Sequence, residues 1–316
     1  MSGIEIIIFF IGGLVLLFVG GEWLIRGSSN LAIKIGITPL IVGLIIVAFG
    51  TSAPELVVSL RAAIMGNSSI SLGNVIGSNI ANIGLIIGVG ALIKPLTVSS
   101  KVIKKEIPIM IGFSILLVII LLDGEIGTID GLIFLIMLVI YCISNVLIAK
   151  KEKHADVNVK FKEELKSKLS ISISIFLIFI GLTLLIIGGN LFLKSAIAIA
   201  RLLKLSDVVI GLTIVSIGTS LPELVTSIIA SYRRESEILL GSIVGSNVFN
   251  ILSILGITAL ITPINSVGIN YIDLGVMIFF AIILLPLSKS GFAITRLEGA
   301  FLVLGYMGYM YYLLPK

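Results

Sequence analysis

Long apolar stretches separated by short polar intervals run along almost the whole chain. Ten of them are long enough to cross a bilayer as helices, which takes about 17 to 25 residues. The predicted spans cover residues 4–25, 39–61, 70–93, 106–122, 131–149, 169–191, 207–230, 239–263, 271–288 and 297–314. This pattern predicts an all-α polytopic membrane protein with ten transmembrane helices.

Polar intervals divide the chain into parts. The longest is 150–168, which is rich in Lys and Glu and is predicted to be a solvated linker with helical character towards its end. It separates a first five-helix repeat at 1–149 from a second at 169–316. Residues 26–38 and 192–206 are amphipathic, and we expect them to be too polar to span the membrane.

Basic residues set the predicted orientation. Most of the 22 Lys and Arg residues follow odd-numbered spans, in intervals that include the linker. Cytoplasmic loops carry such an excess, so the linker is predicted to be cytoplasmic and both termini extracellular. No basic segment precedes the first apolar stretch, so we expect a retained helix rather than a cleaved signal peptide.

Composition agrees with a membrane protein and narrows the function. The chain is 58% hydrophobic and 12% charged, with a mean hydropathy of +1.23, and a soluble domain needs more surface charge. The net charge of +5 is explained by the basic loops, so nucleic-acid binding is not expected. The single cysteine, Cys142, excludes an intrachain disulfide. We expect a multi-pass protein of the cell membrane.

A motif in the second predicted span recurs in the seventh. Gly-Thr-Ser-Ala-Pro-Glu-Leu-Val at 50–57 matches Gly-Thr-Ser-Leu-Pro-Glu-Leu-Val at 218–225, an offset of 168 (218 − 50). The same offset carries, without a gap, Gly20-Gly21 to Gly188-Gly189, Thr38 to Ser206, Gly43 to Gly211, Gly73 to Gly241, Gly77 to Gly245, Ser78 to Ser246, Asn79 to Asn247 and Asn82 to Asn250. Five spans per half give the two copies opposite orientations. Inverted repeats are a transporter architecture, with the substrate bound near the midplane between them.

Glu55 and Glu223 are the only acidic residues well inside the predicted spans. A carboxylate at membrane depth is energetically expensive and therefore suggests a functional site. Each follows a proline, which cannot donate a hydrogen bond to the carbonyl four residues earlier. Both helices are expected to kink and to leave carbonyl oxygens free, which is tolerated where they line a polar cavity. A proton carrier is the alternative role for these carboxylates.

Hydroxyl and amide side chains accompany the two carboxylates. Thr51 and Ser52 share a helical face with Glu55, and the next span adds Ser78 and Asn82. The counterparts in the second copy are Thr219, Ser220, Ser246 and Asn250. Oxygen ligands without Cys or His suit hard cations such as Ca²⁺ and Na⁺. Overlapping sites would couple the exchange of the two ions. The two threonines contribute either their hydroxyls or only their backbone.

The doubled pattern Gly-Thr-Ser-x-Pro-Glu followed by Gly-x-x-x-Gly-Ser-Asn-x-x-Asn resembles the α-repeats of the sodium/calcium exchanger family within the cation/calcium antiporters. The resemblance covers the whole chain and fits a prokaryotic member without a regulatory domain. It implies a transporter rather than an enzyme, with no cofactor and with Ca²⁺ and Na⁺ as transported ions. It also implies that the first and sixth spans slide together across the other eight. Because the site lies within one chain, we expect a monomer to suffice.

The resemblance also implies roles for single residues. Glu55 and Glu223 would be central ligands shared by the calcium and sodium sites. The other metal ligands would be backbone oxygens of Ala48, Thr51, Ser216 and Thr219, the hydroxyls of Ser52, Ser78, Ser220 and Ser246, and the amides of Asn82 and Asn250, which would lie near sodium or water.

Asn250 departs from part of the family, because potassium-dependent members, and some archaeal ones, have Asp at this position. One negative charge fewer predicts exchange that does not require K⁺. A calcium/proton exchanger is the alternative function, although that branch typically carries a Gly-Asn-x-x-Glu motif. A passive cation channel fits the inverted repeat and the paired carboxylates less well.

Overall fold

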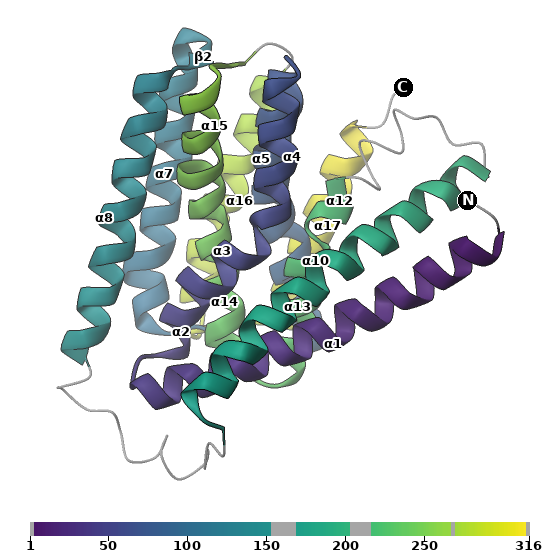
Figure 1. The fold of residues 1–316 in the computed structure, drawn as a ribbon. Helices are drawn as coiled ribbons and strands as arrows, with labels where there is room; N and C mark the ends of the chain where they lie inside the picture. Colours follow the sequence, from purple (N-terminus) through teal and green to yellow (C-terminus); the bar gives the residue numbers. More distant parts are fainter. Residues whose placement is uncertain (1–2, 153–168, 203–215, 267–268, 314–316) are drawn as a thin grey trace.

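The computed structural model describes residues 3–152, 169–202, 216–266 and 269–313. These residues form a bundle of helices (Figure 1). The predicted linker beyond residue 152 and the beginning of the seventh predicted span lie outside the described residues.

Short π-helical and 3₁₀-helical turns interrupt the α-helices at several places. The first half contains α1 (Gly3–Ile35), α2 (Pro39–Val42), η1 (Gly43–Val47), α3 (Ala48–Thr51), α4 (Ala53–Ile64), α5 (Ser68–Ala81), η2 (Asn82–Ile87), α6 (Gly88–Ile93), β1 (Leu96–Thr97), η3 (Val102–Glu106), α7 (Ile107–Ile120), η4 (Leu121–Asp123), β2 (Glu125–Ile126) and α8 (Thr128–Glu152). The second half contains α10 (Ile171–Leu202), α12 (Ser216–Thr219), α13 (Leu221–Tyr232), α14 (Ser236–Phe249), η6 (Asn250–Leu255), α15 (Gly256–Ile261), β3 (Ile264–Asn265), α16 (Tyr271–Lys289), β4 (Ala293–Ile294) and α17 (Arg296–Leu313). The turns η1, η2, η3 and η6 are π-helical.

Seven of the described helices are long and apolar enough to cross a membrane, and the bent pair Pro39–Thr51 and Ala53–Ile64 makes eight. This confirms a multi-pass helical membrane protein. The last predicted span, α17, is not among them, because Arg296 and Glu298 in its first turn lower its mean hydropathy.

α1 and α10 are longer than the predicted spans. The pattern predicts separate amphipathic segments after each span, but α1 continues unbroken to Ile35 and α10 to Leu202. With 33 residues, α1 is about 50 Å long, which exceeds the roughly 30 Å hydrocarbon core. Its polar end remains helical and packed, because Ser28 and Ser29 are buried inside the protein.

Small residues bring α1 and α10 into close contact. Gly13, Gly20 and Gly27 lie seven residues apart on α1, and a β-carbon on them would lie 2.7, 2.8 and 2.7 Å from backbone atoms of α10. Gly188 and Gly181 oppose the first two, which makes the helices antiparallel. Small residues permit such close approach in membranes. The two helices therefore run side by side and slant away from the rest of the bundle (Figure 1).

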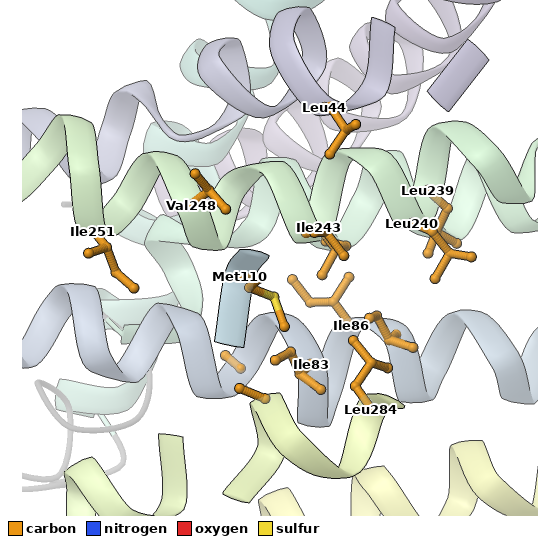
Figure 2. Close-up of a cluster of buried hydrophobic side chains, with 14 of the residues drawn as sticks. Leu44, Ile83, Ile86, Met110, Leu239, Leu240, Ile243, Val248, Ile251 and Leu284 are labelled. Carbon is orange, nitrogen blue, oxygen red and sulfur yellow. The ribbon is translucent and has the colours of Figure 1, made fainter. Parts of the chain in front are cut away.

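α14 forms the centre of the bundle and is buried along almost its whole length. Gly241 and Gly245 allow it to approach α2 and η1, and a β-carbon on Gly245 would overlap the carbonyl oxygen of Leu44. Figure 2 shows Leu44 on one side of α14, while Ile243 points to the other side, towards Ile86. The two glycines, four residues apart, therefore permit a close approach of these helices.

The equivalent of Gly241 in the first copy is Gly73. Among the described residues, a β-carbon on Gly73 would meet Ile269, at 3.8 Å. The segment that would correspond to α2 and η1 in the second half falls within 203–215, outside the described residues. The structure therefore shows the close approach for one of the two copies.

Two short antiparallel strand pairs link the halves of the chain. β1 pairs with β4 through Leu96 and Ile294, and β2 pairs with β3 through Ile126 and Ile264. Adding the sequence offset of 168 to Leu96 and Ile126 gives Ile264 and Ile294, so each pair is the counterpart of the other. β1 precedes α7 and β2 follows it. The two pairs therefore lie at opposite ends of that helix.

Candidate cation-binding site

The two proline-containing motifs lie at breaks in their helices. α3 ends at Thr51 and α4 begins at Ala53, and the segments on either side are bent by 43°. In the second copy, α12 and α13 are separated at Ser220. Both breaks agree with the predicted effect of the proline that follows, since a proline removes one hydrogen bond from the helix.

Glu55 and Glu223 lie in the first turns of α4 and α13, and each is 1% exposed. The hydroxyl of Ser220 donates to Glu55 Oε1 at 3.1 Å, and the hydroxyl of Ser52 donates to Glu223 Oε1 at 3.3 Å. Each serine thus contacts the carboxylate of the opposite motif. The hydroxyl of Ser78 lies 3.4 Å from that of Ser220. The fold therefore brings the two duplicated motifs together.

Asn82 and Asn250 each begin a π-helical turn, η2 and η6. Such turns occur frequently at functional sites. Asn82 Nδ2 donates to Asn247 Oδ1 at 2.8 Å, and Asn250 Nδ2 donates to Asn79 Oδ1 at 3.0 Å. Each amide nitrogen is therefore engaged by the opposite half of the chain, while the amide oxygen is left for another partner.

Several buried oxygens in these segments have no hydrogen-bond donor among the described residues. They include Glu55 Oε2, Glu223 Oε2, Asn82 Oδ1, Asn250 Oδ1 and Ser246 Oγ, and the hydroxyls of Ser227 and Ser242 also have no partner there. The two carboxylates are related by the repeat, and so are the two amides. A buried acceptor without a donor is unfavourable, and a cation can take the place of the donor. Carboxylate, amide and hydroxyl oxygens are the ligands that hard cations prefer, so this set fits such an ion.

The remaining predicted ligands differ in how well they are placed. The hydroxyl of Thr51 donates to the carbonyl of Val47 at 3.0 Å, which favours a backbone role for this threonine. Ala48 lies one turn earlier, where its carbonyl accepts the N–H of the residue after Thr51 at 3.0 Å. Thr219 is buried at the end of α12. Ser216 is the first residue of α12, and its side chain is outside the described part.

Asn79, Asn247 and Asn74 were not predicted as site residues. The first two belong to the duplicated motif, which was the available signal for them. Asn74 Nδ2 donates to the carbonyl of Glu55 at 3.2 Å and to Ser59 Oγ at 2.9 Å. It therefore ties α5 to the turn that carries the carboxylate. The repeat gave no signal for Asn74, because the residue 168 positions later is a serine.

A cavity of about 260 Å³ lies beside the two motifs. Its walls include Pro54 and Val57 of α4, Gly189 and Asn190 of α10, and Thr219 of α12. Pro54 directly precedes Glu55, so the cavity reaches the turn that holds this carboxylate.

Residues 5–147 and 173–314 match the sodium/calcium exchanger protein family. A protein named as a candidate antiporter, CaxA of Alkalimonas amylolytica, is 38% identical over 97% of this chain and 98% of its own. The sodium/calcium exchanger MaX1 of Methanosarcina acetivorans is 31% identical over 94% and 95% of the two chains. The solved structure of the sodium-calcium exchanger NCX_Mj, soaked with Na⁺ and Sr²⁺, has a TM-score of 0.86 and 32% identity and covers 99% of this chain and 100% of its own. The chain therefore belongs to the sodium/calcium exchanger protein family and is a multi-pass membrane antiporter of cations.

Proposed function

We propose that this protein exchanges Na⁺ for Ca²⁺ by alternating access and does not require K⁺. The ions bind near the membrane midplane, between inverted five-helix halves at residues 1–149 and 169–316. The linker at 150–168 is cytoplasmic, and both termini are extracellular. No cofactor takes part. One chain contributes both halves of the site, so a monomer suffices.

The observation that carries this proposal is the set of donor-free oxygens from both halves. Glu55 and Glu223 supply two negative charges, which neutralise one Ca²⁺. The neutral oxygens of Asn82, Asn250 and Ser246 extend the set, so that Na⁺ ions can be coordinated after calcium has left. Because the same carboxylates serve both ions, calcium and sodium exclude each other, and this exclusion couples the two fluxes.

The strand pairs support the inverted arrangement of the two halves. The offset that relates the halves carries β1 to β3 and β2 to β4, and it therefore carries one strand pair onto the other. The pairs lie at opposite ends of α7. The symmetry that relates the two halves therefore exchanges the two ends of the bundle. Two halves related in this way have opposite orientations in the membrane.

Packing on the two sides of the site supports alternating access. On α1, Gly21 is covered, since a β-carbon there would lie 2.6 Å from Ile229 Cδ1 and 3.3 Å from Val225 Cγ1. Its counterpart on α10, Gly189, borders the cavity, and a β-carbon there would lie no nearer than 4.0 Å to an atom of the described residues. The side of the site at Gly21 is therefore closed by packed side chains, whereas the related side at Gly189 is open to the cavity. Joint sliding of α1 and α10 would open the first and close the second.

Sodium-driven calcium uptake is the direct test. Purified protein in proteoliposomes loaded with Na⁺ should take up radiolabelled calcium from a sodium-free medium, and uptake should stop when Na⁺ is equal on both sides. A pH gradient without a sodium gradient should drive no uptake. Uptake that follows the pH gradient and ignores sodium would instead identify a calcium/proton exchanger.

Potassium should have no effect on this exchange. The amide of Asn250 brings one negative charge fewer than the aspartate found at this position in potassium-dependent members of the family. We therefore expect the same initial rate of sodium-driven uptake whether potassium or choline is the counter-cation. A rate that rises with potassium concentration and saturates would show a potassium site and contradict this part of the proposal.

A salt bridge joins α1 to the end of α13 on the closed side of the site, near Gly21. The guanidinium of Arg233, which follows α13, bonds both carboxylate oxygens of Glu22 on α1, with Nε donating to Oε2 at 2.8 Å. The counterparts 168 residues away, Asn190 and Met65, carry no charge. The salt bridge therefore stabilises closure of one side only and should favour the conformation seen here.

Breaking this salt bridge should expose the closed side more often. A partly exposed pair contributes up to about 1 kcal/mol, so Glu22→Gln should raise the population open on this side by up to about fivefold. The readout is the thiol-labelling rate of Val225→Cys, made in a Cys142→Ser background. Glu125→Gln, which removes an exposed charge from β2, is the control and should leave the rate unchanged. Equal labelling rates in all variants would show that the salt bridge does not stabilise the closed conformation of this side.

A further inference from the structure

Asn79 and Asn247 are buried polar residues to which the proposed ion coordination assigns no role. Each lies three residues before a candidate ligand, Asn82 or Asn250, and both are almost completely buried. The offset of 168 relates the two residues to each other. A buried amide that binds no ion must place its donors and its acceptor on protein groups.

The two amides bond to each other's backbone across the halves of the chain. Asn79 Nδ2 donates to the carbonyl of Asn247 at 3.3 Å, and Asn247 Nδ2 donates to the carbonyl of Asn79 at 3.4 Å. Asn247 Nδ2 also lies 3.5 Å from the sulfur of Met110. With both nitrogens held in this way, each Oδ1 is turned towards the other half of the site.

These oxygens receive the amides of the candidate ligands. Asn79 Oδ1 accepts from Asn250 Nδ2 at 3.0 Å, and Asn247 Oδ1 accepts from Asn82 Nδ2 at 2.8 Å. The NH₂ ends of Asn82 and Asn250 are therefore fixed, and their Oδ1 atoms are the ends left without a donor. Turned by 180°, either amide would lose this bond and present N–H groups to a cation.

We propose that Asn79 and Asn247 are positioning residues that fix the amide orientation of Asn250 and Asn82, so that the oxygen of each faces the ions. Each half of the chain thereby orients a ligand of the other half. A cation is attracted to an amide oxygen and repelled by an amide N–H, so the orientation decides whether the residue binds or repels the ion. This inference rests on the proposed function, in which the two asparagines coordinate transported ions.

A double-mutant cycle tests the inference for Asn79. Asn79→Leu removes both amide functions and keeps the number and branching of the side-chain heavy atoms, and Asn250→Ala removes the ligand. Each should raise the KM of the same ion, by about fivefold for the loss of roughly 1 kcal/mol, with little change in kcat. If Asn79 acts through Asn250, the double variant should have the KM of Asn250→Ala alone, because coupled residues are not additive.

Controls separate positioning from general packing. Asn145→Leu makes the same change at another buried asparagine, on α8, and should leave the KM of both ions at the wild-type value. If Asn79→Leu does not accumulate in folded form, the same cycle is measured with Asn79→Ala. The reciprocal cycle pairs Asn247→Leu with Asn82→Ala.

The outcomes distinguish this inference from the proposed function. Effects of Asn79→Leu and Asn250→Ala that multiply in the double variant would overturn the inference and leave sodium/calcium exchange intact. An unchanged KM for both ions in Asn250→Ala would also overturn it, because the premise of a ligand at this position would fail. Absence of sodium-driven uptake by the wild type would overturn the proposed function itself.

Discussion

Glu55→Gln is expected to reduce sodium-driven calcium uptake by about 100-fold or more. The amide keeps the size of the side chain but removes one of two negative charges from a buried site. Loss of one partner from a buried charge interaction costs about 3–5 kcal/mol, and each 1.4 kcal/mol is a factor of ten. Glu223→Gln should be equally severe, because each carboxylate accepts a hydrogen bond from a serine of the opposite motif in the same way.

The control for this pair is Glu125→Gln. Glu125 is exposed in β2, at the end of the bundle, and the same chemical change there should leave the rate of radiolabelled calcium uptake at the wild-type value. Thermal unfolding of each variant shows whether it is folded. A folded Glu55→Gln or Glu223→Gln protein that transports calcium at a near-normal rate would exclude the carboxylates as the central ligands.

Gly245→Ala should be among the most destabilising single-methyl additions in the described part of the chain. A β-carbon on this residue of α14 would overlap the carbonyl oxygen of Leu44 and lie 2.8 Å from the β-carbon of Ala48. Backbone atoms cannot rotate away as a flexible side chain can, so α14 must shift against η1. Overpacking of this kind typically costs about 1–3 kcal/mol. We expect a lower midpoint of thermal unfolding in detergent and reduced transport, because Ala48 lies in the segment that leads to the site.

Gly112→Ala is the matched control for this substitution. Gly112 lies within α7, where a β-carbon would meet no atom of the described part of the chain within 4 Å. Alanine favours a helix over glycine by about 1 kcal/mol, so this variant should be as stable as the wild type or more stable. Equal unfolding midpoints for the two variants would show that the contact between α14 and η1 is looser than the structure indicates.

The helical membrane fold could be predicted from the apolar stretches, but the extent of the helices could not. Hydropathy separates lipid-facing segments from polar ones. The first span was therefore predicted to end near residue 25, before Arg26. The helix continues to Ile35 because Ser28, Ser29 and Gly27 face other helices rather than lipid. Burial of small polar side chains is a property of the packed bundle, and a window along the sequence does not detect it.

The candidate site, too, could be predicted from the sequence only in part. Glu55 and Glu223 could be identified from the sequence because a carboxylate is rare at membrane depth, and the following span supplied the asparagines through the repeat. No pattern in the sequence indicated that Asn82 and Asn250 begin π-helical turns. It also did not indicate which end of each amide is free, because this depends on hydrogen bonds to Asn247 and Asn79.

By itself, the sequence determined the duplication, the two buried carboxylates and the breaks beside them, because these follow from residue identity, spacing and the missing N–H of proline. The tertiary structure decided which groups meet: Ser52 with Glu223, Ser220 with Glu55, and each asparagine with one from the other half. It also decided that Gly21 is covered while Gly189 borders a cavity. Partners that lie about 170 residues apart are brought together by packing of the whole bundle, and no local pattern records that packing.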